Sequence, residues 1–452
     1  MIMNSENFNI SLIDGIPRKN SRRRSVYLEG TQPFYQKSGK NPNPVIKVAP
    51  YDPSGPGGPV RAFHDSRELD SVFFNSIKPM VYLLKAVGIF PIGNTGCVFQ
   101  TTPQLLIYSI AVFVVIFAYI CYIRWDKVEM VRSAEGRFEE AVIDYLFTVY
   151  LVPIVINPIA WYEAKKQARV LTNLVAFEKL YQKVTKNKFP LLLGNKSLII
   201  AIGLPVLATV TMVVTHLTMV HFKFLQVVPY CYINMITYLV GGAWYLYCDL
   251  LGNIALTVAK DFKQALKNIG PSSRIADYRS LWMMLSRLIR DVGNAFGYTV
   301  TFLCLYLFLI ITLTIYGLMS QMQEGLGIKD VGLTITAVFA TATLFFICDE
   351  AHYGSNCVKV QFQKRLLLVE LNWMNDDAQQ EINMFLRATE MNPTDMSLGG
   401  FFDVNRNLFK SLIATMVTYL VVLLQFQISI PEDGSSSGSA SSNDNNSTKI
   451  LR

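Results

Sequence analysis

Charged residues are scarce in this chain. Asp, Glu, Lys and Arg together make up 16% of its 452 residues, whereas soluble proteins usually carry about 25%. Apolar residues make up 51%, and the mean hydropathy is +0.31. This composition excludes an ordinary soluble domain and predicts a membrane protein. The net charge of +8 does not indicate a nucleic-acid partner, because most Lys and Arg flank apolar segments instead of forming a basic face.

Residues suited to metal or catalytic chemistry are also few. The chain has four histidines, which are too widely spread for a three-histidine zinc site. Its seven cysteines are an odd number without a C-x-x-C pair, which argues against a disulfide framework and a thiolate zinc site. P-loop and H-E-x-x-H motifs are absent. We therefore expect no enzyme activity, no catalytic residue, no metal and no cofactor.

Long apolar runs are missing from both ends of the chain. Residues 1–70 are polar and rich in Pro and Gly, so we expect a disordered cytoplasmic tail without a cleavable signal peptide. Residues 431–452 are rich in Ser and Asn and are expected to form a disordered extracellular tail. Asn445 and Asn446 each begin an N-x-[ST] sequon there and are glycosylation candidates.

Between the tails, seven apolar segments are each long enough to cross the hydrocarbon core, which needs about 20 helical residues. The sequence therefore predicts an all-α fold, a seven-transmembrane helical bundle. The segments are Thr102–Ile123, Glu140–Trp161, Leu198–Val220, Val227–Leu250, Gly297–Met319, Val331–Ala351 and Ser411–Ile430.

The distribution of Lys and Arg predicts an intracellular amino terminus. With that orientation, 33 of the 41 Lys and Arg lie in cytoplasmic segments and 8 lie outside, as the positive-inside rule requires.

A G-protein-coupled receptor, the first alternative, would have the opposite orientation, and its DRY and NPxxY motifs are missing. A secondary transporter, the second alternative, would show broken helices in matching repeats, but the span prolines cluster in spans two to four.

The cytoplasmic loops carry helical periodicity. In Asn253–Asn294, a first helix has Ala255, Val258, Phe262 and Leu266 on one face, and Gly270-Pro271 ends it. Residues 358–390 predict two further helices, the second with an apolar face at Ile382, Phe385, Leu386 and Thr389. We expect 71–351 to hold spans one to six with these loop helices, and 352–410 to form intracellular helices that pack on each other or on a neighbouring subunit.

Five polar or aromatic residues near the outer ends of the second, third and fourth spans are candidates for a ligand pocket. They are Asp144, Tyr145, His216, Tyr230 and Tyr232. Ionisable groups inside a membrane are costly and therefore suggest function. The alternative, which the sequence leaves equally open, is that Asp144 and His216 are interfacial groups that reach water.

The last span carries a mostly polar stripe. Its members recur at spacings of three and four and are Thr415, Thr418, Val422, Gln425 and Ser429. Tyr419 and Phe426 flank the stripe. A helix that faces lipid has no need of such a stripe, which fits either hydrogen bonding between helices or the wall of a water-filled pore.

The stripe overlaps a motif of a known family. Residues 418–426 read TYLVVLLQF, which resembles the TY-five-apolar-QF motif that closes insect gustatory receptors. Other stretches resemble the carbon dioxide receptor branch of that family. They are FEEAVIDYLF (138–147), QVVPYC (226–231), YGLMSQMQEGLGIKDVGLTITA (316–337), ICDEAHYGS (347–355) and the segment 367–410.

This resemblance implies the insect chemoreceptor ion-channel fold, with 352–410 as a cytoplasmic helical anchor domain and 411–430 as the pore-lining span. It implies a ligand-gated, non-selective cation channel, assembled as a heterotetramer with paralogous gustatory receptor subunits in the plasma membrane of sensory-neuron dendrites. Carbon dioxide or bicarbonate would be the ligand. Val422, Gln425 and Phe426 would fall at the gate and constriction, although the related odorant co-receptor has Leu where this chain has Phe426.

An epitope tag at the amino terminus tests the orientation. Because of the 33-to-8 split, we expect antibody to reach this tag only in permeabilised cells, whereas a tag after the last residue should be reached in intact cells. Labelling of the amino-terminal tag in intact cells would contradict the predicted topology and favour a G-protein-coupled receptor.

Overall fold

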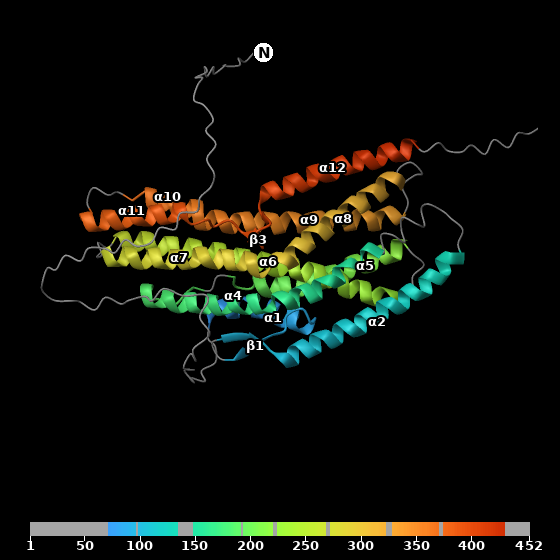
Figure 1. The fold of residues 1–452 in the computed structure, drawn as a ribbon, viewed down its shortest axis with the longest axis horizontal. Helices are drawn as coiled ribbons and strands as arrows, with labels where there is room; N and C mark the ends of the chain where they lie inside the picture. The colour runs from blue at the N-terminus through green and yellow to red at the C-terminus, as the bar shows by residue number, and fades with distance from the viewer. Residues whose placement is uncertain are drawn as a thin grey trace, which may run out of the picture. The chain divides into compact units, whose positions relative to one another are not determined.

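The computed structural model describes residues 71–95, 98–133, 148–190, 193–219, 224–267, 272–321, 328–369 and 374–429, which all belong to one compact unit, His64–Arg452. Helices dominate these ranges, which confirms the predicted all-α class (Figure 1). The α-helices are α1 Val72–Ala86, α2 Pro103–Ser133, α4 Ile156–Thr185, α5 Lys196–Met219, α6 Phe224–Lys267, α7 Ser272–Ala295, α8 Gly297–Gln321, α9 Ile328–Asn356, α10 Phe362–Leu367, α11 Asp376–Met391 and α12 Arg406–Ser429.

Short elements connect these helices. A 3₁₀ turn, η1, covers Val152–Val155, and a π-helical turn, η2, covers Cys357–Gln361. Strands β1 (Ile92–Thr95) and β2 (Val98–Thr101) form one antiparallel hairpin. Strands β3 (Ser397–Leu398) and β4 (Phe402–Asp403) form a second, which pairs Ser397 with Asp403 and leads directly into α12.

Six helices within the described ranges are long and apolar enough to span a membrane. They overlap six of the seven predicted spans and are Pro103–Trp125, Lys196–Thr218, Val227–Leu266, Gly297–Met319, Val331–Leu367 and Arg406–Gln425. The remaining predicted span, Glu140–Trp161, lies partly outside the described residues. Its described part, from residue 148, consists of the four residues before η1, η1 itself and the start of α4.

Helix α6 extends far beyond the bilayer. Its 44 residues span about 66 Å at a 1.5 Å rise, roughly twice the 30 Å hydrocarbon core. The sequence prediction of a separate loop helix after Leu250 is therefore wrong, because the fourth span and that helix are continuous. The predicted apolar face itself is confirmed, since Ala255, Val258 and Phe262 are buried.

The cytoplasmic ends of the helices share one hydrophobic core. Phe262 of α6, Phe362 of α10 and Phe385 of α11 form a ring cluster with centroid distances of 5.4–6.0 Å. Trp282 of α7 packs beside them, and its indole N–H donates to the Val358 carbonyl in η2 at 3.0 Å. The loop helices therefore pack on each other within the chain, which is one of the two arrangements that the sequence leaves open.

Helix α4 binds the start of α8 through a buried carboxylate. Glu163 is 0% exposed. It accepts hydrogen bonds from the Tyr298 N–H at 2.8 Å, the Thr299 N–H at 3.1 Å and the Thr299 hydroxyl at 2.6 Å. These N–H groups have no partner within α8, because the first turn of a helix leaves its donors free. Burial raises the pKa of the Glu163 carboxyl above its ordinary value, and the hydrogen bonds oppose that rise.

A second glutamate of α4 binds the start of α1 in the same way. Glu178 is buried and accepts hydrogen bonds from the Ser71 hydroxyl at 2.5 Å and the Val72 N–H at 3.0 Å. Ser71 is also the N-cap of α1, with its hydroxyl accepting from the Phe74 N–H. Helix α4 thus orients two other helices by their amino-terminal ends.

Replacement of Glu163 tests this contact. Glu163→Ala removes the acceptor for three buried donors, so we expect a loss of about 3 kcal/mol of folding stability. Glu163→Gln should cost less, because the amide keeps one acceptor and avoids burying a charge. The measurement is the melting temperature of the detergent-solubilised full chain. Glu390→Ala, at an exposed position of α11, is the control. Equal melting temperatures for the two alanine variants would contradict the role of Glu163 as an acceptor for the first N–H groups of α8.

Candidate functional site

Helix α12 is the least packed of the candidate spans. Only 11% of the residues in its most apolar 18-residue segment are buried, compared with 83% of those in the corresponding segment of α6. It packs along α8 and α9 (Figure 1). The side chains that make this contact include Met416 and Leu420, both buried, with Tyr419 meeting the edge of Phe308 at 6.3 Å and Phe409 packing on Phe345 at 5.4 Å. An apolar helix with so little contact inside its own chain has most of its surface available for lipid or for other chains.

The polar stripe predicted from the sequence lies on the exposed part of α12. Thr415, Thr418, Val422 and Gln425 are all exposed. The Thr415 and Thr418 hydroxyls donate to carbonyls one turn earlier in the same helix, at 2.8 and 3.1 Å. These two threonines therefore satisfy their donors locally and do not bridge to a neighbouring helix of the chain. The side chains of Phe426 and Ser429 lie outside the described residues.

The segment 397–407, here called the root of α12, holds the inner end of that helix against the bundle. Gly399 and Gly400 have φ of +59° and +82° and form the turn between β3 and β4. The hairpin lies against the junction of α7 and α8 at very short range. A Cβ added to Gly293 would lie 2.5 Å from the Ser397 carbonyl oxygen, and one added to Gly297 would lie 2.7 Å from the Gly399 nitrogen.

Polar contacts complete the root. The Arg406 guanidinium forms an ion pair with Asp349 near the inner end of α9. The Asn405 side chain caps α12 by accepting from the Asn407 and Leu408 N–H groups at 2.9 and 3.0 Å. Just before the hairpin, the Pro393 carbonyl accepts from Arg290 of α7 at 2.6 Å. The start of α12 is therefore attached to both α9 and α7.

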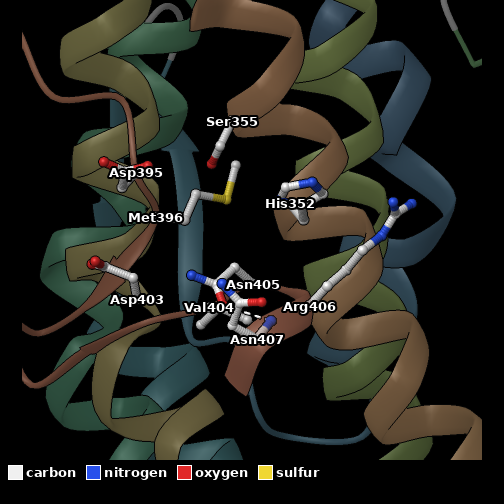
Figure 2. Close-up of a pocket in the computed structure, with 9 residues that line it drawn as sticks. All are labelled: His352, Ser355, Asp395, Met396, Asp403, Val404, Asn405, Arg406 and Asn407. Atoms are coloured by element: carbon white, nitrogen blue, oxygen red, sulfur yellow. Dashed lines mark hydrogen bonds between the residues drawn. The ribbon is translucent and has the colours of Figure 1, made fainter. Parts of the chain in front are cut away.

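A pocket of about 180 Å³ lies between α9 and the root. Figure 2 shows Ser355 and His352 projecting from α9 on one side, with Met396, Asn405 and Asn407 opposite. The buried Ser355 hydroxyl has no hydrogen-bond partner among the described residues. The sequence analysis missed this pocket, because its lining comes from two segments about 40 residues apart. The pocket leaves unfilled space where α9 meets the start of α12.

The candidates for an outer pocket separate in the structure. His216 and Tyr230 are each 1% exposed, and their rings lie 5.1 Å apart. Tyr232 is on the opposite face of α6, where its hydroxyl donates to the Val87 carbonyl at 2.8 Å and accepts from Asn157 at 3.4 Å. Burial contradicts the interpretation of His216 as an interfacial group that reaches water. Asp144 and Tyr145 lie outside the described residues.

Three hydroxyls near His216 link separate elements. The Tyr150 hydroxyl donates to Thr336 Oγ1 of α9 at 2.9 Å, and Thr215 Oγ1 of α5 lies 3.4 Å from the same atom. We call Tyr150, Thr215 and Thr336 the outer cluster. The cluster connects the segment before η1 to α5 and α9 inside an otherwise apolar region, where a hydrogen bond is worth more than at a wet surface.

Comparison with known proteins places these features in a family context. The model of the 7tm chemosensory receptor family matches residues 77–430. Gustatory and odorant receptor 24 of Anopheles gambiae is 52% identical over 382 residues, covering 83% of this chain and 84% of that receptor. Gustatory and odorant receptor 22 of the same mosquito is 27% identical, covering 81% and 80%. The structure of the insect olfactory receptor OR5 from Machilis hrabei superposes with a TM-score of 0.58 at 15% identity, covering 78% of this chain and 98% of that one.

The glycines at the α7–α8 junction give a test of the root. We expect Gly297→Ala and Gly293→Ala each to cost about 1–3 kcal/mol, because the new methyl group would collide with hairpin backbone that cannot rotate away. Gly203→Ala in α5 meets open space and should be neutral or stabilising by up to about 1 kcal/mol. Melting temperatures of the solubilised chains make the comparison. If all three variants melt alike, the hairpin does not pack at this junction.

Proposed function

Because the chain belongs to the 7tm chemosensory receptor family, whose model covers residues 77–430, we propose that it is a subunit of a ligand-gated, non-selective cation channel that responds to carbon dioxide or bicarbonate. Membership confirms the predicted resemblance to insect gustatory receptors, and the match to a solved insect olfactory receptor confirms the predicted fold. The chain is a multi-pass membrane protein and a chemosensory receptor, not an enzyme.

The observation that carries the channel proposal is the exposure of α12. A helix whose apolar segment is only 11% buried, with a row of Thr, Val and Gln on its open surface, is suited to line a pore together with the equivalent helices of other subunits. In a ring of such helices, Gln425 would present amide groups to passing ions. Val422 and Phe426 would form apolar rings that close by dewetting, and Thr415, Thr418 and Ser429 would continue the wall toward both ends.

The same exposure supports assembly with other subunits. A lone α12 would leave polar groups facing lipid, whereas a heterotetramer with paralogous gustatory receptor subunits would place them around an aqueous axis. The relatives are named gustatory and odorant receptors, which supports a place in the plasma membrane of sensory neurons. In this proposal, residues 352–410 form the cytoplasmic anchor that holds the subunits together.

The buried pair of His216 and Tyr230 supports a small, weakly polar ligand. Their rings lie 5.1 Å apart inside the outer half of the bundle, next to the outer cluster. Carbon dioxide has no hydrogen to donate and would need only an imidazole or phenol donor at such a place. Bicarbonate carries a charge and would need a cation, which protonated His216 would provide. The two ligands therefore make different demands on one side chain.

Whole-cell recording tests the function. Cells that co-express this chain with paralogous receptor subunits should give an inward cation current on a carbon dioxide step, and cells without it should not. Raising bicarbonate at constant pH and carbon dioxide separates the two ligands. Solute flux without current would overturn the channel proposal in favour of a transporter.

Substitutions in α12 test its role in the pore. Phe426→Ala should raise the ligand-free current about fivefold, since loss of an apolar ring worth about 1 kcal/mol favours the open state. Gln425→Ala should change the relative permeability of cations. Leu424→Ala, at a half-buried position, is the control, with surface labelling to compare expression. Unchanged leak together with unchanged permeability would exclude α12 from the pore wall.

A further inference from the structure

One face of α4 carries cations and an aromatic ring just beyond the membrane. Tyr162, Lys165, Lys166 and Arg169 are all exposed and recur at the spacings i, i+3, i+4 and i+7 that place residues on one side of a helix. The residues between them, including Glu163 and the next turn's Gln167, are buried. We call the four exposed residues the α4 patch.

Two more exposed aromatic side chains extend the α4 patch from other elements. The Tyr298 ring of α8 lies 6.2 Å from the Tyr162 ring and 6.0 Å from the Phe401 ring. Lys166 Nζ lies 5.3 Å from the centre of the Tyr298 ring. Phe401 is 66% exposed at the tip of the β3–β4 hairpin. A phenylalanine ring exposed to water at the tip of a hairpin contributes no burial energy to the fold.

The position of these residues matches the inner surface of the bilayer. Tyr162 follows the predicted end of the second span, and Tyr298 is the second residue of the membrane-spanning α8. Phe401 precedes the membrane helix α12 by five residues. Aromatic side chains gather at this depth because their rings suit the interface between headgroups and acyl chains.

The three cations of the α4 patch form no ion pair with a carboxylate of the described residues, although the charge of Lys166 acts on the nearby Glu163. The nearby Glu163 carboxylate faces inward and is occupied by the amino-terminal end of α8. Three unpaired positive charges beside three aromatic rings are complementary to a multiply charged phosphate group attached to an acyl chain.

We propose that the α4 patch, with Tyr298 and Phe401, binds the headgroup of a phosphoinositide, an anionic phospholipid of the inner leaflet. Lys165, Lys166 and Arg169 bind the phosphates, while the aromatic rings lie among the upper acyl carbons. The site is independent of whether the receptor conducts ions. It has a mechanical consequence, because Phe401 belongs to the hairpin that starts α12, so a bound lipid holds the root of α12 against α4 and α8.

A lipid fits this surface better than a second protein chain. Helix α12, with its exposed stripe, packs on α8 and α9, whereas α4 packs on α7, α8 and α1. Subunits that assemble through α12 leave the three cations of α4 toward the surrounding bilayer, and this step rests on the proposed function. An interface between chains would also bury Lys165, Lys166 and Arg169 together, at a cost that an apolar partner could not offset.

Lipid binding to the purified full chain tests the site. The chain is placed in phosphatidylcholine nanodiscs and titrated with a fluorescent phosphatidylinositol bisphosphate. Lys165→Ala with Lys166→Ala should weaken binding about 25-fold, since each basic residue near an anionic surface contributes roughly a fivefold gain. The control, Lys183→Ala with Lys188→Ala, removes the same charge from exposed positions farther into the cytoplasm and should leave binding unchanged.

A second variant separates the lipid from a free phosphate compound. Phe401→Ser should weaken binding of the lipid several-fold but not binding of soluble inositol trisphosphate, because only the lipid engages the aromatic rings. If both double variants lost the same affinity for the lipid, the effect would be general charge attraction, and the proposed binding site would be wrong. Equal affinity for lipid and soluble headgroup would overturn the assignment to lipid. Loss of subunit assembly in Lys165→Ala with Lys166→Ala, without loss of lipid, would assign the surface to a protein partner.

Discussion

The bilayer requires that every backbone N–H and carbonyl within it find a partner inside the protein, and the structure follows from this requirement. Helices meet it along their length but leave free donors in their first turn. Glu163 supplies the acceptors for α8, Glu178 those for α1, and Asn405 those for α12. Side chains of α4 thus fix the starts of α8 and α1 to a neighbouring helix, and α12 is capped by the residue directly before it.

The parts of the fold that the sequence predicts are those set by local periodicity. Length and apolarity identified the described spans, and the spacing of Ala255, Val258 and Phe262 identified a buried face correctly. The contacts that position the site join residues far apart in the chain, such as Glu163 with Thr299 or Gly293 with Ser397. A single sequence has no signal for such pairs. The Gly399-Gly400 dipeptide did carry a turn signal, but nothing in it indicated which helices the hairpin would meet.

Helix α12 shows how stability and function differ along the chain. In α6, 83% of the apolar segment is buried, whereas in α12 only 11% is buried. Its attachment is concentrated at the root, where an ion pair, a helix cap and a glycine-lined contact meet within about ten residues. A helix fixed firmly at one end and loosely along its length can tilt about that end at low energetic cost, because few packed side chains must rearrange.

Helix α9 connects the outer half of the bundle to this root. Thr336 of the outer cluster and Asp349, the partner of Arg406, lie on the same unbroken helix, about 20 Å apart at a 1.5 Å rise. A shift of α9 caused by a ligand near His216 would therefore reach the Arg406 ion pair without passing through a loop. The pocket beside His352 and Ser355 leaves room for that shift, since space between packed elements lets them move without overlap. The inner end of α12 is thus the place where ligand binding outside and lipid binding inside would act on the same few residues.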